Sequence, residues 1–167
     1  MHAPVVPAVL LAHILDRSAQ EAERGREVLF HLGYSPLCPT FEGWMLDEPP
    51  QTQTATSCRP LEDGPGSTHD RALIEVHSHH QMPARFSSQD NRDETGFRIY
   101  VVIGDYPHGG SASWQINVRV GVYGHFWHIP SDLVFENPGL VLDAALPVYP
   151  EVVAGVTQAY PLGGNHA

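Results

Sequence analysis

Three side chains that can bind a metal ion lie close together in the segment HSHHQMPARFSSQD: His77, His79 and Asp90. The residues RALIEVHS predict a buried strand over 71–78. At the end of a strand, residues two apart point to the same face about 7 Å apart, so both imidazoles can lean onto one ion. Zinc accepts imidazole nitrogen and carboxylate oxygen at about 2.0 to 2.2 Å, and three protein ligands leave its fourth position open for water. The pattern is therefore compatible with a catalytic zinc site.

The same residues also have purely structural interpretations. Ser87 and Asp90 have the spacing of a capping box, and an acidic residue in the first turn of a helix is favoured by the helix dipole. A His-x-His pair on its own is a weak indication of metal binding. His69 and His80 are interpreted as surface residues. Because adjacent strand residues point to opposite faces, His80 is not expected to share an ion with His79.

The spacing of the whole segment favours the metal interpretation. It resembles the signature of the JAB/JAMM metalloprotease family, also called the MPN domain, in which His-Ser-His is followed by seven residues, serine, two residues and aspartate. His77, His79, Ser87 and Asp90 agree with all of these separations. The resemblance implies a JAMM-type zinc metallopeptidase or isopeptidase, similar to deubiquitinases, with one Zn2+ per chain held by His77, His79 and Asp90. One departure is His80, where many members have proline.

The resemblance also implies two catalytic side chains. The family has a glutamate at the start of the strand that follows the first helix, and Glu27 in REVLFHLG occupies that place. It would accept the proton of the attacking water and pass it to the leaving amine. Glu75 is a competing candidate, because it shares a strand face with the two histidines. Ser87 would donate a hydrogen bond to the oxyanion, whereas Ser78 faces away and is interpreted as structural.

Two longer segments indicate a branch of the family. The stretches VHSHHQMPARFSSQDNRDETGFRIYVVIG and RVGVYGHFWHIPSDLVFE resemble the bacterial branch of PRTRC system protein A. This resemblance implies a peptide or isopeptide bond at the C-terminus of a ubiquitin-like modifier as the substrate, and E1-like and E2-like proteins as partners. A non-catalytic MPN scaffold that binds a ubiquitin-like protein, and a zinc hydrolase of a small amide, remain as alternatives. HExxH and PCxxC patterns of other zinc enzymes do not occur.

Composition limits the partners and the compartment. The 167 residues, 42% of them hydrophobic and 17% charged, are typical of one soluble domain. A formal charge of −10 opposes binding to nucleic acid or to anionic membranes. The two cysteines, Cys38 and Cys58, do not make a disulfide framework, and no run approaches the ~20 apolar residues of a membrane span. We therefore expect a cytoplasmic protein.

All nine basic residues are arginine, because the chain contains no lysine. Codon bias explains this composition. A second interpretation follows from the family resemblance, since a chain without lysine offers no side-chain amine for conjugation of a modifier.

The elements expected to position these residues form an α+β fold. Apolar spacing predicts a helix over 7–24, which Gly25 ends. A strand over 27–32 follows, and Gly33 and Pro36 indicate a turn after it. A loop-rich excursion follows at 35–70, with strands expected near 41–46 and 53–58. A short helix should then begin at Ser87 and end at Gly96.

A strand over 97–103 and a long strand over 114–127, which could pair as a hairpin, complete the expected sheet. Prolines interrupt residues 130–167, which we expect to wrap the core. The family resemblance implies a single domain over residues 1–167, with a mixed, partly barrel-like β-sheet flanked by helices in a cytidine-deaminase-like layering.

Overall fold

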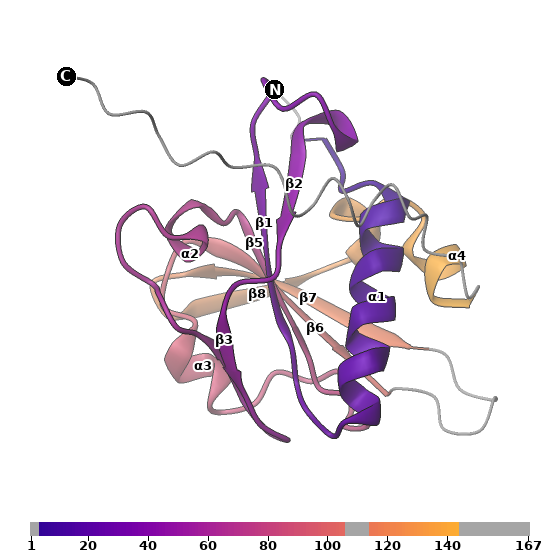
Figure 1. The fold of residues 1–167 in the computed structure, drawn as a ribbon, viewed down its shortest axis with the longest axis vertical. Helices are drawn as coiled ribbons and strands as arrows, with labels where there is room; N and C mark the ends of the chain where they lie inside the picture. The colour runs from indigo at the N-terminus through magenta and orange to yellow at the C-terminus, as the bar shows by residue number, and fades with distance from the viewer. Residues whose placement is uncertain (1–3, 106–113, 144–167) are drawn as a thin grey trace.

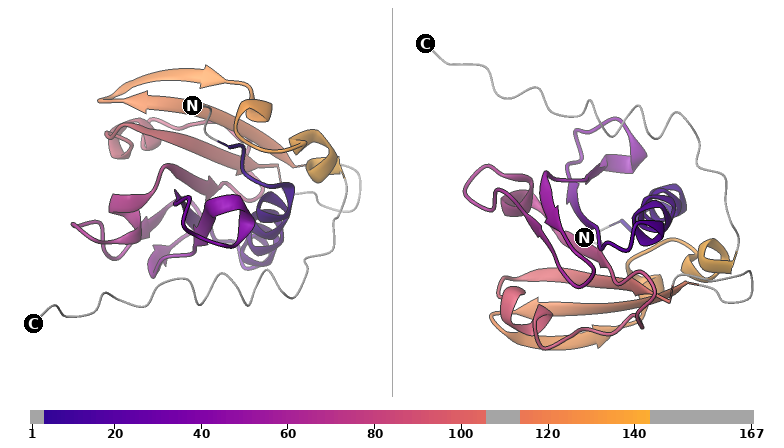
Figure 2. Two further views of the ribbon diagram at one scale, coloured as in Figure 1. Left: turned by 90° about the horizontal axis from the view of Figure 1, so that it is seen from above. Right: turned by 60° about the horizontal axis from the view of Figure 1, so that its bottom comes forward.

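The computed structural model describes residues 4–105 and 114–143 of the chain. Its main element is a six-stranded sheet formed by β1 (Leu29–Tyr34), β2 (Trp44–Asp47), β5 (Ile74–Ser78), β6 (Arg98–Gly104), β7 (Gln115–Val122) and β8 (His125–Ile129). The strand order is β2-β1-β5-β6-β7-β8. All neighbouring strands are antiparallel except β5 and β6, which run parallel. The sheet is twisted, with β2 and β8 at its edges (Figure 1, Figure 2), and the predicted mixed α+β architecture is confirmed.

Helix α1 (Ala8–Glu23) covers one face of the sheet (Figure 1). Pro7 precedes its first turn, where a missing N–H leaves no hydrogen bond unmade. Gly25 follows its end with φ at 68°, a left-handed conformation that glycine adopts without strain. The helix predicted over 7–24 is therefore confirmed. Each fully buried aliphatic side chain on its inner face contributes roughly 1.5 to 3 kcal/mol by leaving water; these residues are Leu10, Leu11 and Ile14.

Successive side chains of strand β5 point alternately to the apolar core and to the polar face of the sheet. Ile74 and Val76 join the buried cluster of α1, β1 and β6. Glu75 and His77 point to the opposite face, where they line a cavity. Parallel pairing with β6 and antiparallel pairing with β1 fix this register on both sides. Every second residue of β5 therefore serves packing, and the others are available for chemistry.

Short elements cover the cavity face. They are β3 (Gln51–Gln53), β4 (Cys58–Pro60), α2 (Thr68–Arg71) and α3 (Asp90–Asp93). Figure 1 shows β3, α2 and α3 on the opposite side of the sheet from α1. Strands β3 and β4 pair only with each other and form a two-stranded hairpin.

Several predicted strands have different bounds. The strand expected over 41–46 begins instead as a 3-10 turn, η1 (Phe41–Gly43), in which Phe41 and Glu42 have positive φ. Residues 53–58 are mostly the turn between β3 and β4, where Thr54 and Ser57 hydrogen-bond across the reversal. The excursion at 35–70 therefore holds β2 and a hairpin, and the strand expected near 53–58 was wrong.

The long strand predicted over 114–127 was also wrong, because the chain reverses within it. Tyr123 and Gly124 both have positive φ, the combination of a type I′ hairpin turn. Strand β7 ends before this turn and β8 returns beside it. The expected pairing of this region with the preceding strand is confirmed by the β6–β7 register. The helix expected from Ser87 to Gly96 is shorter, because regular α-helix is confined to α3.

Residues 130–143 return to the N-terminal part of the chain. They contain η2 (Ser131–Leu133) and α4 (Pro138–Asp143), and Phe135 forms a parallel bridge with Val6. Figure 2 shows α4 beside α1. Residues 144–167 of the predicted proline-rich wrap lie outside the described residues. In the described ranges, no helix combines the length and the apolar character that crossing a bilayer requires.

Candidate metal centre

His77, His79 and Asp90 are brought together at the end of β5. Nε2 of His77 lies 3.1 Å from Nε2 of His79. Asp90 places Oδ1 3.5 Å from the His77 nitrogen and Oδ2 3.8 Å from the His79 nitrogen. Both histidines are buried and Asp90 is half-buried. The three residues can thus present one ligand atom each to a common point.

These separations suit a tetrahedral metal ion. Ligand atoms at zinc distances and tetrahedral angles lie about 3.4 Å from one another. The three observed distances, from 3.1 to 3.8 Å, bracket that value. Two imidazoles and one carboxylate also form the type of donor set that leaves a fourth zinc position for water. The His-His-Asp triad therefore fits a metal ion such as zinc.

The surroundings of His77 and His79 favour the neutral imidazole forms that can bind a metal ion. Nδ1 of His79 is 3.1 Å from the carbonyl oxygen of Pro83, so this nitrogen carries the proton and Nε2 keeps its lone pair. Burial, more than any charge, lowers the pKa of His77 to about 4. Neutral imidazole is the form that binds a metal ion. His77 is therefore in its metal-binding form at neutral pH.

Asp90 and Ser87 hydrogen-bond to each other at the start of α3. The Asp90 N–H donates to Ser87 Oγ at 3.2 Å, and the Ser87 N–H donates to Asp90 Oδ2. This reciprocal pair is the capping box considered from the sequence. Burial alone would raise the pKa of Asp90, but the attraction of His77 and the hydrogen bonds from Ser87 lower it. Asp90 therefore caps the helix and also faces His77 as a carboxylate.

Glu27 lies just before β1 and is fixed through its backbone. Its N–H donates to the Thr54 carbonyl at 2.8 Å, and its own carbonyl accepts from Gln53 Nε2 at 2.8 Å. The next residue, Val28, donates its N–H to Ser78 Oγ at 3.0 Å. Ser78 thus satisfies a neighbouring backbone group, as expected from its structural interpretation. The β3–β4 hairpin and β5 together position Glu27.

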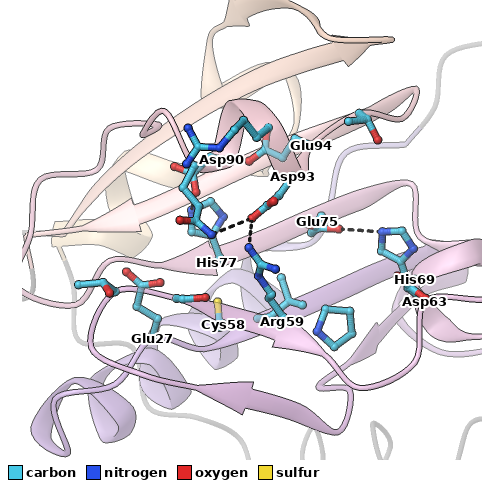
Figure 3. Close-up of a pocket in the computed structure, with 17 residues that line it drawn as sticks. Glu27, Cys58, Arg59, Asp63, His69, Glu75, His77, Asp90, Asp93 and Glu94 are labelled. Carbon is cyan, nitrogen blue, oxygen red and sulfur yellow. Dashed lines mark hydrogen bonds and ion pairs between the residues drawn. The ribbon is translucent and has the colours of Figure 1, made fainter.

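The Glu27 side chain is 3% exposed and lines the cavity (Figure 3). Burial, and then the negative charge of Asp90, raise its pKa to about 8. Its Oε1 has no hydrogen-bond partner among the described residues. A buried carboxyl group with a pKa near neutrality and an uncommitted oxygen can both accept and release a proton.

Glu75 lines the same cavity but is already paired. Arg98 Nη1 lies 2.9 Å from its Oε2, and His69 Nε2 lies 3.5 Å from the same oxygen. Figure 3 shows the contact with His69, on the opposite side of Glu75 from His77. The paired carboxylate is less free than Glu27 to move a proton. His69, expected to be a plain surface residue, is only partly exposed, because it lines this cavity.

The cavity has a volume of about 410 Å3 and lies between the β3–β4 hairpin and α3. Arg59 and Asp93 form an ion pair of 2.8 Å that links these two elements, and both side chains are about half exposed. His77 and Asp90 line one part of the cavity and Glu75 and His69 another. Two residues of the triad, His77 and Asp90, are therefore reached through an open, strongly polar space.

His80, the departure from the family signature, has a structural contact. It has φ at 36°, and its Nε2 lies 2.8 Å from the carbonyl oxygen of Ala55 in the β3–β4 turn. The side chain thus connects the triad loop with the hairpin that positions Glu27. The expectation from strand alternation, that His80 does not share an ion with His79, agrees with this contact.

Sequence reasoning missed one pair near the site. Arg119 on β7 and Glu94 form an ion pair of 2.6 Å, and both side chains are almost fully buried. The available signal was a single arginine inside the apolar strand QINVRVGV, because a buried arginine is rarely found without a partner. The partner itself could not be identified, since it lies 25 residues away in the sequence.

A comparison with protein families matches residues 12–117 to the family described as prokaryotic homologs of the JAB domain. The matched region covers more than half of the chain, begins within α1 and ends within β7. It includes the three triad residues as well as Glu27 and Ser87. A comparison with curated proteins finds no match.

Proposed function

The chain belongs to the family of prokaryotic homologs of the JAB domain, and on this premise we propose that it is a zinc-dependent hydrolase of amide bonds. The observation that carries the proposal is the triad of His77, His79 and Asp90, whose ligand atoms are spaced for one tetrahedral ion. When bound, zinc supplies a Lewis acid that polarises the scissile carbonyl and lowers the pKa of its water to about 7.

Glu27 is the proposed proton carrier. A divalent cation held by His77, His79 and Asp90 would oppose the influence of Asp90 and would lower the pKa of Glu27 from its value of about 8, which would make the carboxylate available. The carboxylate accepts a proton from the attacking water as the new C–O bond forms. It then protonates the amine nitrogen as the C–N bond breaks. The pairing of Glu75 with Arg98 supports Glu27 as the residue with this role.

Ser87 is the proposed donor to the oxyanion. Its Oγ accepts hydrogen bonds from the N–H groups of Gln89 and Asp90, both at 3.2 Å. Because these contacts use the lone pairs of the oxygen, the hydroxyl proton is left to donate, either to the Asp90 carboxylate, with which the Ser87 side chain also hydrogen-bonds, or to the oxyanion. Loss of one oxyanion donor commonly lowers the rate about 10²- to 10³-fold.

The proposed substrate is a peptide or isopeptide bond at the C-terminus of a bacterial ubiquitin-like modifier or its conjugate. The resemblance of residues 76–104 and 119–136 to PRTRC system protein A supports this choice, and it adds E1-like and E2-like proteins of a cytoplasmic system as proposed partners. The cavity volume of about 410 Å3 lies in the usual range of ligand pockets, so it would accommodate a few residues of a chain end as well as a small amide.

Metal content is the first test. Elemental mass spectrometry of untagged protein should find about one zinc per chain. Glu27→Gln should retain the zinc and Asp90→Ala should lose it, because Asp90 is a proposed ligand and Glu27 is not. Absence of metal from the wild type after reconstitution would contradict the hydrolase proposal and favour a non-catalytic scaffold that binds a ubiquitin-like protein.

Substrate class needs a separate test. Zinc-loaded protein should release a fluorescent amine from the C-terminus of a ubiquitin-like protein, and Glu27→Gln, which keeps the metal, should not. If the same protein instead cleaves only short amides of one or two residues, the substrate is a small molecule and the modifier proposal fails.

A further inference from the structure

Arg119 lies on the cavity face of β7, next to the segment 86–94 that carries Ser87 and Asp90. It is 3% exposed. The proposed hydrolytic steps do not use it, and it contacts none of the triad ligands through a hydrogen bond in the described residues. A buried guanidinium is costly unless several partners compensate for its lost hydration.

The partners of Arg119 all come from the segment 86–94 or from the adjacent strand β8. Its Nε and Nη2 donate to Glu94 Oε2 at 2.8 and 2.6 Å, and its Nη1 donates to Asn91 Oδ1 at 2.5 Å. Its Cζ lies 3.8 Å from the ring centroids of both Phe86 and Phe126. The planar group is therefore stacked between two rings and hydrogen-bonded along its edge.

The residues of this segment that Arg119 contacts lie on both sides of Ser87 and Asp90 in the sequence. Phe86 immediately precedes Ser87, Asn91 immediately follows Asp90, and Glu94 lies one turn further on. One side chain on the sheet thus holds this segment at both ends. The segment needs such support because, in the described ranges, the backbone hydrogen bonds of 86–94 run only to residues of the same loop.

We propose that Arg119 is a positioning residue for the metal centre: it fixes the segment 86–94 so that the Asp90 carboxylate reaches the two histidines. His77 is held in strand β5 by its two neighbouring strands, and His79, one residue beyond β5, donates its N–H to the Ile103 carbonyl of β6 at 2.6 Å. Asp90 depends instead on side-chain anchors. The inference rests on the proposed metal site. Loss of Arg119 should therefore weaken metal binding without removing a ligand.

The test is the affinity for Co2+ and Zn2+, measured by competition with a chromophoric chelator. Arg119→Gln should raise the dissociation constant about 10- to 100-fold, as the loss of residues that orient metal ligands usually does. Arg119→Lys should recover part of this loss, because it keeps the charge but cannot reach Asn91 and Glu94 together. Asn91→Ala, at an exposed position, should give a smaller loss in the same direction.

Arg98→Gln is the matched control. Arg98 is also a largely buried arginine on the cavity face, with contacts of 2.9 Å to Glu75 and 2.6 Å to the His69 carbonyl. Neither of these partners belongs to the segment 86–94. Arg98→Gln should leave the affinity for the metal nearly unchanged. An equal loss in both variants would overturn the inference, because the effect would then come from general destabilisation.

A spectroscopic measurement separates positioning from stability. The visible absorption of bound Co2+ is intense for four-coordinate sites, and the Arg119→Gln spectrum should weaken as Asp90 withdraws, while that of Arg98→Gln should match the wild type. A wild-type spectrum and affinity in Arg119→Gln would overturn this inference alone. A wild-type protein that binds neither metal would overturn the proposed function and this inference together.

Discussion

On the α1 face of the sheet, strands β1, β5 and β6 present aliphatic and aromatic side chains that are almost fully buried. On the cavity face, the same three strands present residues that include His31, Glu75, His77 and Arg98. Two arginines on this second face are buried with acidic partners, in the pairs of Arg119 with Glu94 and Arg98 with Glu75. Apolar burial favours folding, whereas buried ion pairs contribute little net stability and are costly when broken. The side chains that mainly stabilise the fold and those of the candidate site therefore lie on opposite faces of one sheet.

The largest expected effect of a single change on the cavity face is on catalysis. Glu27→Gln should lower kcat about 10²- to 10⁴-fold, because the amide cannot carry a proton from water to the leaving amine. Steady-state hydrolysis of the amide substrate measures this change, with metal content as a control for the site. Glu75→Gln should have a smaller effect, and the reverse order would transfer the proton-carrying role to Glu75.

A truncation on the α1 face should affect stability instead. Ile14 is completely buried, and Ile14→Ala should lower the free energy of unfolding by about 2 to 5 kcal/mol through lost apolar contact and the remaining cavity. Urea denaturation measures this loss. The folded variant should bind metal with wild-type affinity, and a large loss of affinity would show that the two faces are not independent.

The pH dependence of stability should originate on the cavity face. Burial lowers the pKa of His31 to about 3 and of His77 to about 4, so the metal-free fold loses stability as the pH falls below 6.5, where the unfolded chain takes up protons. Glu27 acts in the opposite direction. Its pKa is about 8 in the fold and 4.5 in the unfolded chain, so stability also decreases as the pH rises through this interval.

Denaturation of metal-free protein at a series of pH values measures both limbs. Glu27→Gln should make the loss of stability at alkaline pH smaller and leave the loss at acid pH unchanged. Part of the alkaline loss remains, because burial also raises the pKa of Glu94 to about 8. Ile14→Ala should lower the whole curve without changing its shape. A change of shape in Ile14→Ala would contradict the separation of the two faces.

The smallest expected effect concerns Ser78, which belongs to the packed face but supports Glu27. Ser78→Ala should lower the free energy of unfolding by about 1 to 3 kcal/mol, because the Val28 N–H loses its buried acceptor. The rate of hydrolysis should also fall, since Val28 is the neighbour of Glu27. Thermal denaturation and kcat are the measurements, and an unchanged kcat would mean that the hairpin alone positions Glu27.

Sequence reasoning placed the elements whose hydrophobic pattern is continuous and misplaced those that depend on backbone conformation. Helix α1 and the apolar strands β5 and β6 lie close to their predicted positions. The turn at Tyr123 was missed because tyrosine rarely adopts positive φ. Gly124 was the available signal, but the alternating apolar run favoured placing it within a strand. Phe41 and Glu42 caused the same error at the start of β2.

For the candidate site, local spacing was sufficient for the triad. His77 and His79 share a strand face by simple alternation, and the position of Asp90 followed from the family signature. The anchors were not predictable, because Arg119 meets Asn91 and Glu94 only through the tertiary fold. The catalytic roles of Glu27 and Ser87 stay predictions until rates are measured.

The parallel pair β5–β6 joins two antiparallel groups of strands, β2-β1-β5 and β6-β7-β8. A parallel pair must wait for its crossover connection to close, and that delay slows folding relative to local pairings. The connection here, residues 79–97, carries Asp90 and Ser87, while Arg119 comes from the second group. The centre can therefore assemble only in the step that unites both groups. A partly folded chain emerging from the ribosome therefore lacks a complete metal centre of His77, His79 and Asp90.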